Sequence, residues 1–155
     1  MTKYEKLLTY CEELGIKIKE IDFKSDKKIG YTQDNYILIN SNVPEQQKYE
    51  LLAEELGHFK TTFGNIVNQA TINDVKQELK ARRYGYNKIV SLQGIIEAFE
   101  KNCLTAYEIA EYLEVSYEYF KDCINDYKKQ YGLYHQINNY YIMFEPTLSI
   151  CKYFN

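Results

Sequence analysis

A predicted helix from about residue 44 to residue 62 organises the rest of the chain. Its first turn combines a polar cap residue, a proline and an acidic side chain, which together are typical of a helix N-terminus. On a helical wheel of about 100° per residue, the apolar side chains fall on one stripe, which consists of Leu52, Leu56, Phe59 and Phe63. The chain must therefore fold so that other elements cover this stripe.

Three ionisable side chains lie on the flank of the stripe: Glu54, Glu55 and His58. Glu54 and His58 are four residues apart, so they point the same way from successive turns. The segment E-E-x-x-H differs by one residue from H-E-x-x-H, in which two histidines bind zinc and the glutamate acts as a base. Glu54 stands in place of the first histidine. The spacing alone favours a solvated helix face with a packed histidine, because E-E-x-x-H is common by chance.

A second long helix is predicted from residue 73 to residue 90, and it offers a further carboxylate. One face of this helix carries Val75, Ala81, Gly85 and Ile89, and its small residues permit the close approach of another helix. Glu78 lies in the middle of that face, where a carboxylate is costly unless it is paired, protonated or bound to a metal. Asp74, one turn earlier, is the alternative candidate.

Glu54, His58 and Glu78 together supply one nitrogen and two carboxylates, which is a donor set that zinc accepts. The extra carboxylate makes the site harder than one with two histidines, so manganese or iron would also be tolerated. Glu55 would be the general base that takes a proton from the water attacking a peptide carbonyl.

The remaining elements predict an α+β fold. A helix at residues 3–14, an alternating strand at 16–23 and a hairpin at 29–40 give an N-terminal helix and a small antiparallel sheet packed on a zincin-like motif helix. A polar loop at about 64–72 separates the two long helices. A helix at 91–102, a helix-turn-helix at 104–120 and a hairpin at 131–144 then predict a helical bundle with a winged-helix-like tail. We expect a peptidase-like domain at residues 1–100 and the tail at residues 101–155.

The charge of the tail argues against direct binding of nucleic acid. The whole chain has a net charge of −3, and acidic residues outnumber basic ones between residues 103 and 131. A helix that reads DNA presents lysine or arginine to the phosphates. A protein-docking or structural role is therefore favoured, and the tyrosines of the tail would either form an interface or pack the core with their hydroxyls exposed to water.

Composition limits other kinds of chemistry. Four scattered cysteines without a C-x-x-C pair predict buried, reduced thiols rather than structural zinc or a disulfide framework. The apolar runs are too short to span a membrane, and the N-terminus predicts an amphipathic helix rather than a signal peptide. We therefore expect a cytoplasmic protein.

The segments from Leu52 to His58 and from Gln77 to Gly85, with the hairpin at 29–40, resemble the ImmA/IrrE family of metallopeptidases. The resemblance covers about residues 1–90, and the tail is similar to that of phage and mobile-element members. It implies that His58 and Glu78 bind the metal and that Glu55 is the base, with Glu54 in the place of the first histidine. It also implies a zinc metallo-endopeptidase that cleaves a helix-turn-helix repressor and so derepresses a prophage or integrative element.

Two other functions stay open at this point. A metal-free protein of the same fold could neutralise a repressor by binding it, in which case Glu55→Gln and His58→Ala would leave derepression intact. A DNA-binding regulator could act through the winged-helix tail. A gel-shift experiment that shows no more than weak, fully salt-sensitive DNA binding would count against this function.

Overall fold

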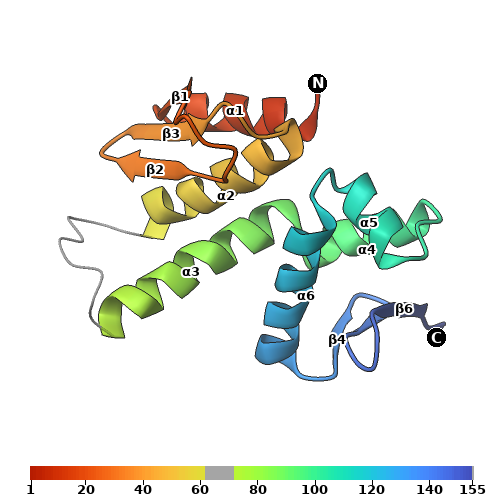
Figure 1. Cartoon of the computed structure of the whole chain (residues 1–155). Helices are drawn as coiled ribbons and strands as arrows, with labels where there is room; N and C mark the ends of the chain where they lie inside the picture. The colour runs from red at the N-terminus through yellow and green to blue at the C-terminus, as the bar shows by residue number, and fades with distance from the viewer. Residues whose placement is uncertain (62–71, 155) are drawn as a thin grey trace. The chain divides into compact units, whose positions relative to one another are not determined.

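The computed structural model describes residues 1–61 and 72–154, with side chains from residue 75 onward in the second range. Phe63 and most of the predicted loop at 64–72 lie outside the described residues. The chain divides into two compact units, Met1–Ile89 and Val90–Asn155. The predicted domains, residues 1–100 and 101–155, stay a prediction about which parts fold independently. Figure 1 shows the elements of both units.

The first unit is an α+β unit whose helices and strands confirm the predicted order. Its elements are α1 (Lys3–Glu13), β1 (Lys17–Ile21), β2 (Gly30–Gln33), β3 (Tyr36–Asn40), α2 (Glu45–Thr61) and α3 (Ile72–Ile89). The sheet has the strand order β1-β3-β2. Figure 1 shows α2 between this sheet and α3.

The prediction of an antiparallel sheet is wrong for one of its two strand pairs. β2 pairs with β3 in antiparallel fashion, as the hairpin predicted, but β1 pairs with β3 in parallel, with Lys17 opposite Tyr36. After β1 the chain crosses to the far edge, forms β2, and returns through the centre of the sheet as β3. The two strands that run in the same direction are therefore neighbours, and β2 is left as an edge strand.

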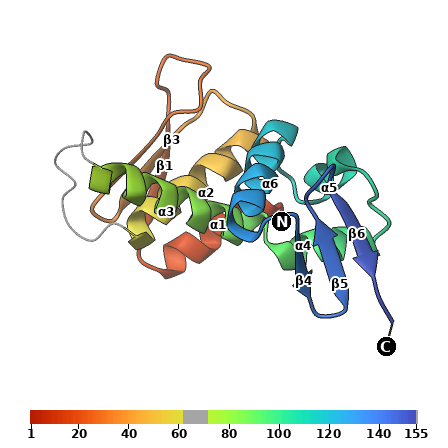
Figure 2. The same cartoon turned by 90° about the horizontal axis from the view of Figure 1, so that it is seen from below.

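Helix α2 is buried on more than the single predicted stripe. Leu52 and Leu56 are fully buried, as predicted, and Phe59 is half-buried. The buried set also includes Ala53, Glu55 and Gly57, because the sheet covers one side of the helix and α3 covers another. Figures 1 and 2 both show α3 running alongside α2.

The small residues of α2 and α3 explain how closely these two helices approach. A Cβ atom added at Gly57 would lie 2.1 Å from the backbone oxygen of Ala81, and one added at Gly85 would lie 3.2 Å from the backbone of Ala53. The predicted close helix contact is therefore confirmed. Val75, by contrast, is 66% exposed although it was expected on the same face. Six residues separate it from Ala81, which turns it about 120° away around the helix axis.

A buried ion pair ties α2 to the connection before β2. Glu50 is fully buried, and the Lys28 ammonium lies 2.8 Å from its carboxylate. This pair could not be predicted from the sequence, because Lys28 lies in a polar segment that looks solvated. Nearby, the buried Asn40 side chain donates to the carbonyl oxygens of Ser25 and Lys27, which holds the same connection in place.

Lys28→Met is expected to lower the free energy of unfolding by about 2 kcal/mol, since it removes the ammonium that pairs with a buried carboxylate. The cost is below that of a fully buried pair because the Lys28 side chain is 36% exposed. Urea denaturation measures the change. Lys27→Met, on an exposed neighbour, is the matched control, and equal stability of the two variants would contradict the role of the pair.

The second unit confirms the predicted helices and hairpin and adds a strand. Its elements are α4 (Leu92–Glu100), α5 (Ala106–Tyr112), α6 (Tyr117–Tyr131), β4 (Tyr134–Ile137), β5 (Tyr140–Met143) and β6 (Ser149–Lys152). Thr105 caps α5 with a capping box and Ser116 caps α6, so the helix-turn-helix has defined ends. Asn138-Asn139 form the turn of the predicted hairpin and join β4 to β5, and β6 extends the hairpin to an antiparallel sheet. The α+β fold class is confirmed.

The tyrosines of this unit fall into a buried group and an exposed group. Tyr119 and Tyr140 are buried in the core, whereas Tyr107 and Tyr134 are exposed. All four cysteines of the chain are free thiols. Cys11, in the first unit, and Cys123 are buried, Cys103 is half-buried and Cys151 is exposed, so the prediction of buried thiols is wrong for Cys151. It lies on the edge strand β6, where one face of the sheet meets solvent. Within the described ranges, no helix has the length and apolar character needed to cross a membrane.

Candidate metal centre

Three of the predicted site residues converge on one point between α2 and α3. Glu54, His58 and Glu78 each offer one donor atom, and the three atoms lie within 4.8 Å of one another. Nε2 of His58 lies 3.5 Å from Oε2 of Glu78. Residues more than twenty positions apart in the sequence thus form a single cluster.

The positions of these side chains follow from the local sequence of the two helices. Glu54 and His58 are one turn apart on α2, so they project from the same face. Gly57 lies between them, and its contact with Ala81 draws the two backbones together beside them. Glu78 lies one turn before Ala81 on α3, and it therefore reaches across to His58.

The donor set fits a divalent metal ion. Zinc bound by imidazole nitrogen and carboxylate oxygen at about 2.1 Å places its ligand atoms about 3.4 Å apart in tetrahedral geometry. The separation of 3.5 Å between His58 and Glu78 matches that value, and the outer limit of 4.8 Å needs only small side-chain rotations. The three side chains are partly exposed, with 22% exposure for His58 and 40% for Glu78, which leaves room for water and substrate.

Glu55 projects from α2 toward the sheet rather than toward α3. It is 9% exposed, and its carboxylate accepts a hydrogen bond from the Thr32 hydroxyl on β2. Gly30, two residues earlier on β2, also contacts this side chain: a Cβ atom there would lie 2.9 Å from Oε1. The Glu55 side chain therefore lies in a narrow space between the backbone of α2 and the edge strand β2.

Burial raises the pKa of Glu55 above its usual value, because the carboxylate loses water contacts. The hydrogen bond from Thr32 and the electrostatic interaction with His58 lower this pKa, and the negative charges of Glu54 and Glu78 raise it further. A general base works best when its pKa is close to the working pH, so this shift is in the useful direction.

The side chain of Asp74, the alternative third ligand, lies outside the part of the chain whose side chains the structure describes. Thr32 and Gly30 are the two residues in contact with Glu55 that sequence reasoning missed. A hairpin before the motif helix was predicted. Its contact with the Glu55 carboxylate is a long-range contact, which the helical and strand periodicity of the sequence cannot predict.

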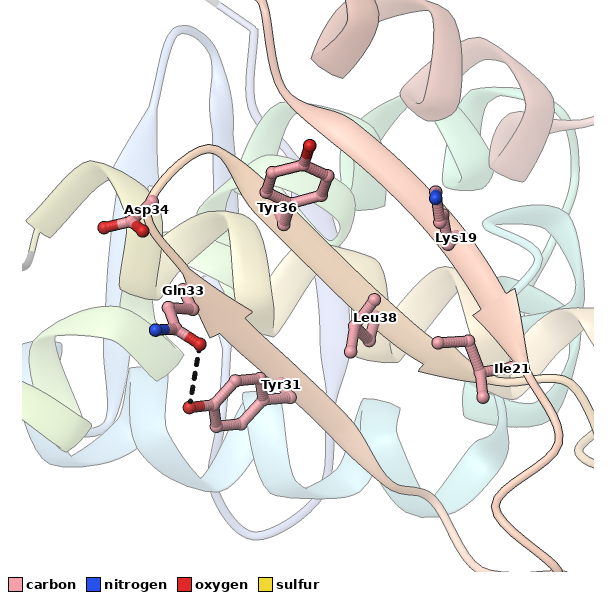
Figure 3. A pocket seen from close by; sticks show the side chains of 7 residues that line it. All are labelled: Lys19, Ile21, Tyr31, Gln33, Asp34, Tyr36 and Leu38. Atoms are coloured by element: carbon pink, nitrogen blue, oxygen red, sulfur yellow. Dashed lines mark hydrogen bonds between the residues drawn. The ribbon is translucent and has the colours of Figure 1, made fainter.

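A separate hollow lies on the opposite face of the same sheet. It has a volume of about 470 Å³ and is lined by Lys19, Ile21, Tyr31, Gln33, Asp34, Tyr36 and Leu38. Figure 3 shows these side chains projecting from the outer face of β1, β3 and β2. None of the four predicted site residues lines it, so the hollow is distinct from the metal centre.

Comparison with known proteins adds one match. The family model described as the IrrE N-terminal-like domain, a peptidase family, matches residues 11–124. That range contains all four predicted site residues and both long helices. No curated protein gives a significant match, and neither does any solved structure.

Proposed function

The chain belongs to the IrrE N-terminal-like family of peptidases, and on that basis we propose that it is a metal-dependent endopeptidase that cleaves a helix-turn-helix repressor. Cleavage would derepress the prophage or integrative element that the repressor silences. The observation that carries the proposal is the convergence of Glu54, His58 and Glu78 beside a buried Glu55. A peptidase site needs both parts, a metal-binding trio and an adjacent base.

In the proposed mechanism, Glu54, His58 and Glu78 would hold the ion, and Glu55 moves the proton. A divalent ion held there would supply Lewis acidity, which lowers the pKa of water toward neutrality and polarises a carbonyl group. Glu55 takes a proton from the attacking water and passes it to the leaving nitrogen, which is general base and then general acid catalysis. The sheet covers one side of Glu55 and excludes bulk water from that side.

The proposed metal is zinc, with manganese or iron as alternatives because two of the three ligands are carboxylates. Glu54→Ala is expected to weaken zinc binding by more than about 100-fold, since the loss of an outer-shell partner alone costs 10–100-fold. Glu54→His should bind zinc at least as tightly as the wild-type protein, because imidazole is a favourable zinc ligand. Competition with a chromogenic chelator measures both affinities.

Glu12→Ala, on the exposed surface of α1, is the matched control for loss of one acidic side chain. If Glu54→Ala binds zinc as tightly as this control, then Glu54 is not a ligand. In that case His58 and Glu78 would need a different third group.

The proposed substrate is a protein with a basic DNA-binding surface, and the surface of the second unit supports this choice. The exposed side of α5 and α6 carries several carboxylates: Glu108, Glu111, Glu118 and Asp122. Such a surface repels DNA and attracts a DNA-reading helix, which must be rich in lysine or arginine. We propose a cytoplasmic location, where such repressors act.

The experiment that tests the proposal is direct cleavage. The protein, loaded with zinc, manganese or iron, is incubated with the helix-turn-helix proteins encoded near its gene, and fragments are identified by mass spectrometry. The proposal expects one repressor to be cut at a defined bond and a chelator to stop the reaction. Stable binding of a repressor without cleavage in any metal would instead favour a non-catalytic antirepressor.

A further inference from the structure

We infer that β2 positions the general base: Thr32 holds one carboxylate oxygen of Glu55, and Gly30 leaves the space that the other oxygen occupies. The inference rests on the proposed function, because it takes Glu55 as the base. Neither β2 residue binds the metal in this proposal. Both act through Glu55 and are positioning residues.

Thr32 is placed for this role by the alternation of the strand. Tyr31 and Gln33 project from the outer face of the sheet, where Figure 3 shows them lining the hollow. Thr32, between them, therefore points to the opposite face, toward α2. Its hydroxyl donates to Oε2 of Glu55 and also lies 3.2 Å from the Glu55 backbone oxygen.

A threonine hydroxyl suits a carboxyl group that changes its protonation state during a reaction. It can donate a hydrogen bond to a carboxylate oxygen, and its lone pairs can accept a hydrogen bond from a carboxylic acid. When the Thr32 hydroxyl accepts a hydrogen bond from a protonated Glu55 carboxyl group, its own hydrogen can turn toward the Glu55 backbone oxygen. Valine has nearly the same shape and lacks both abilities.

Gly30 contributes by what it lacks. A Cβ atom there would lie 2.9 Å from Oε1, 3.0 Å from Cγ and 3.2 Å from Cδ of Glu55. These distances are shorter than carbon atoms normally tolerate, so a side chain at position 30 would push the carboxylate away from its position. The two residues of β2 thus fix Glu55 from two directions, one by a hydrogen bond and one by contact.

The test compares Thr32→Val with Thr32→Ser in the full-length, zinc-loaded protein. The probe is the best-cleaved member of a pool of fluorogenic peptides with a randomised centre. We expect Thr32→Val to lower kcat by about 10- to 100-fold, with KM and bound zinc unchanged. Thr32→Ser should restore most of kcat because it keeps the hydroxyl. Thr9→Val, on the exposed side of α1, is the matched control and should behave as the wild-type protein.

A second readout does not depend on activity. In crystals of zinc-loaded Thr32→Val, the Glu55 carboxylate should turn away from β2, whereas in Thr32→Ser it should stay in place. The inference is overturned if Glu55 keeps its position in Thr32→Val, or if kcat is unchanged. Its failure is distinct from failure of the proposed function: an inactive Glu55→Gln with a fully active Thr32→Val overturns only the role of β2, whereas an active Glu55→Gln overturns the base itself.

Discussion

Replacing Glu55 with glutamine is expected to lower kcat by about 10²–10⁴-fold, which is the usual contribution of general acid–base catalysis. Glutamine keeps the shape of the side chain and can still interact with Thr32, but it cannot take a proton from water. Bound metal should be unchanged, because Glu55 points to the sheet and the three proposed ligands lie toward α3. Peptide cleavage and metal content, measured on the same preparation, check the two halves of this prediction.

The same substitution is expected to stabilise the metal-free protein at neutral pH. The pKa of Glu55 is raised above 4.5 in the folded state, chiefly by burial, so folding disfavours its charged form. The stability of the wild-type protein is therefore fully present below the unfolded pKa and declines as the pH rises through the folded pKa. Glutamine has no charge to bury, so Glu55→Gln escapes this loss.

Urea denaturation in the presence of a chelator, repeated from pH 4 upward, measures the effect. The advantage of Glu55→Gln should be absent at the acidic end, grow as the pH passes the raised pKa of Glu55, and then level off. Glu13→Gln, at an exposed position at the end of α1, controls for the general effect of removing a carboxylate. A stability difference that does not change with pH would show that burial of the charge is not its cause.

The convergence of Glu54, His58 and Glu78 could be predicted because the patterns that point to it lie within single helices. Glu54 and His58 are one helical turn apart, and the small residues around Ala81 predicted a close contact between the two long helices. The approach of Glu78 to His58 could therefore be expected. The pairing of β1 with β3 could not, because alternation shows that a strand has one buried face but not which strand lies beside it or in which direction. The antiparallel expectation failed for that reason.

Contacts between distant polar residues were also beyond reach of the sequence. Lys28 and Glu50 each look like exposed charges within their own segments, and only the fold buries the carboxylate beside the ammonium. Thr32 likewise looked like an ordinary strand residue, although it donates to Glu55, which lies on another element. Helical and strand periodicity predicts the face on which a residue lies, whereas the residue with which it forms an ion pair or hydrogen bond depends on tertiary packing.

Gly57→Ala is expected to lower the free energy of unfolding by about 2 kcal/mol and to weaken metal binding. The added methyl group would lie 2.1 Å from the Ala81 backbone oxygen and 2.9 Å from its carbonyl carbon. Because backbone atoms cannot rotate away, α3 must shift, and we expect overpacking of this kind to cost about 3 kcal/mol, the upper end of the usual range. The gain in helix propensity, about 1 kcal/mol for glycine to alanine, is smaller than that cost. The shift also separates His58 from Glu78, so zinc affinity should fall with stability.

Gly85→Ala is the matched comparison, since it makes the same chemical change in the same pair of helices. Its methyl group would lie 3.2 Å from the nearest backbone atoms of Ala53, a distance that a displacement of a few tenths of an ångström relieves. We therefore expect Gly85→Ala to change stability by less than about 1 kcal/mol, because the propensity gain offsets most of the crowding. Urea denaturation and zinc titration of the two variants, side by side, separate the effects. If Gly57→Ala proved as stable as Gly85→Ala and bound zinc equally well, the close contact of Gly57 with Ala81 would not be what brings the ligands together.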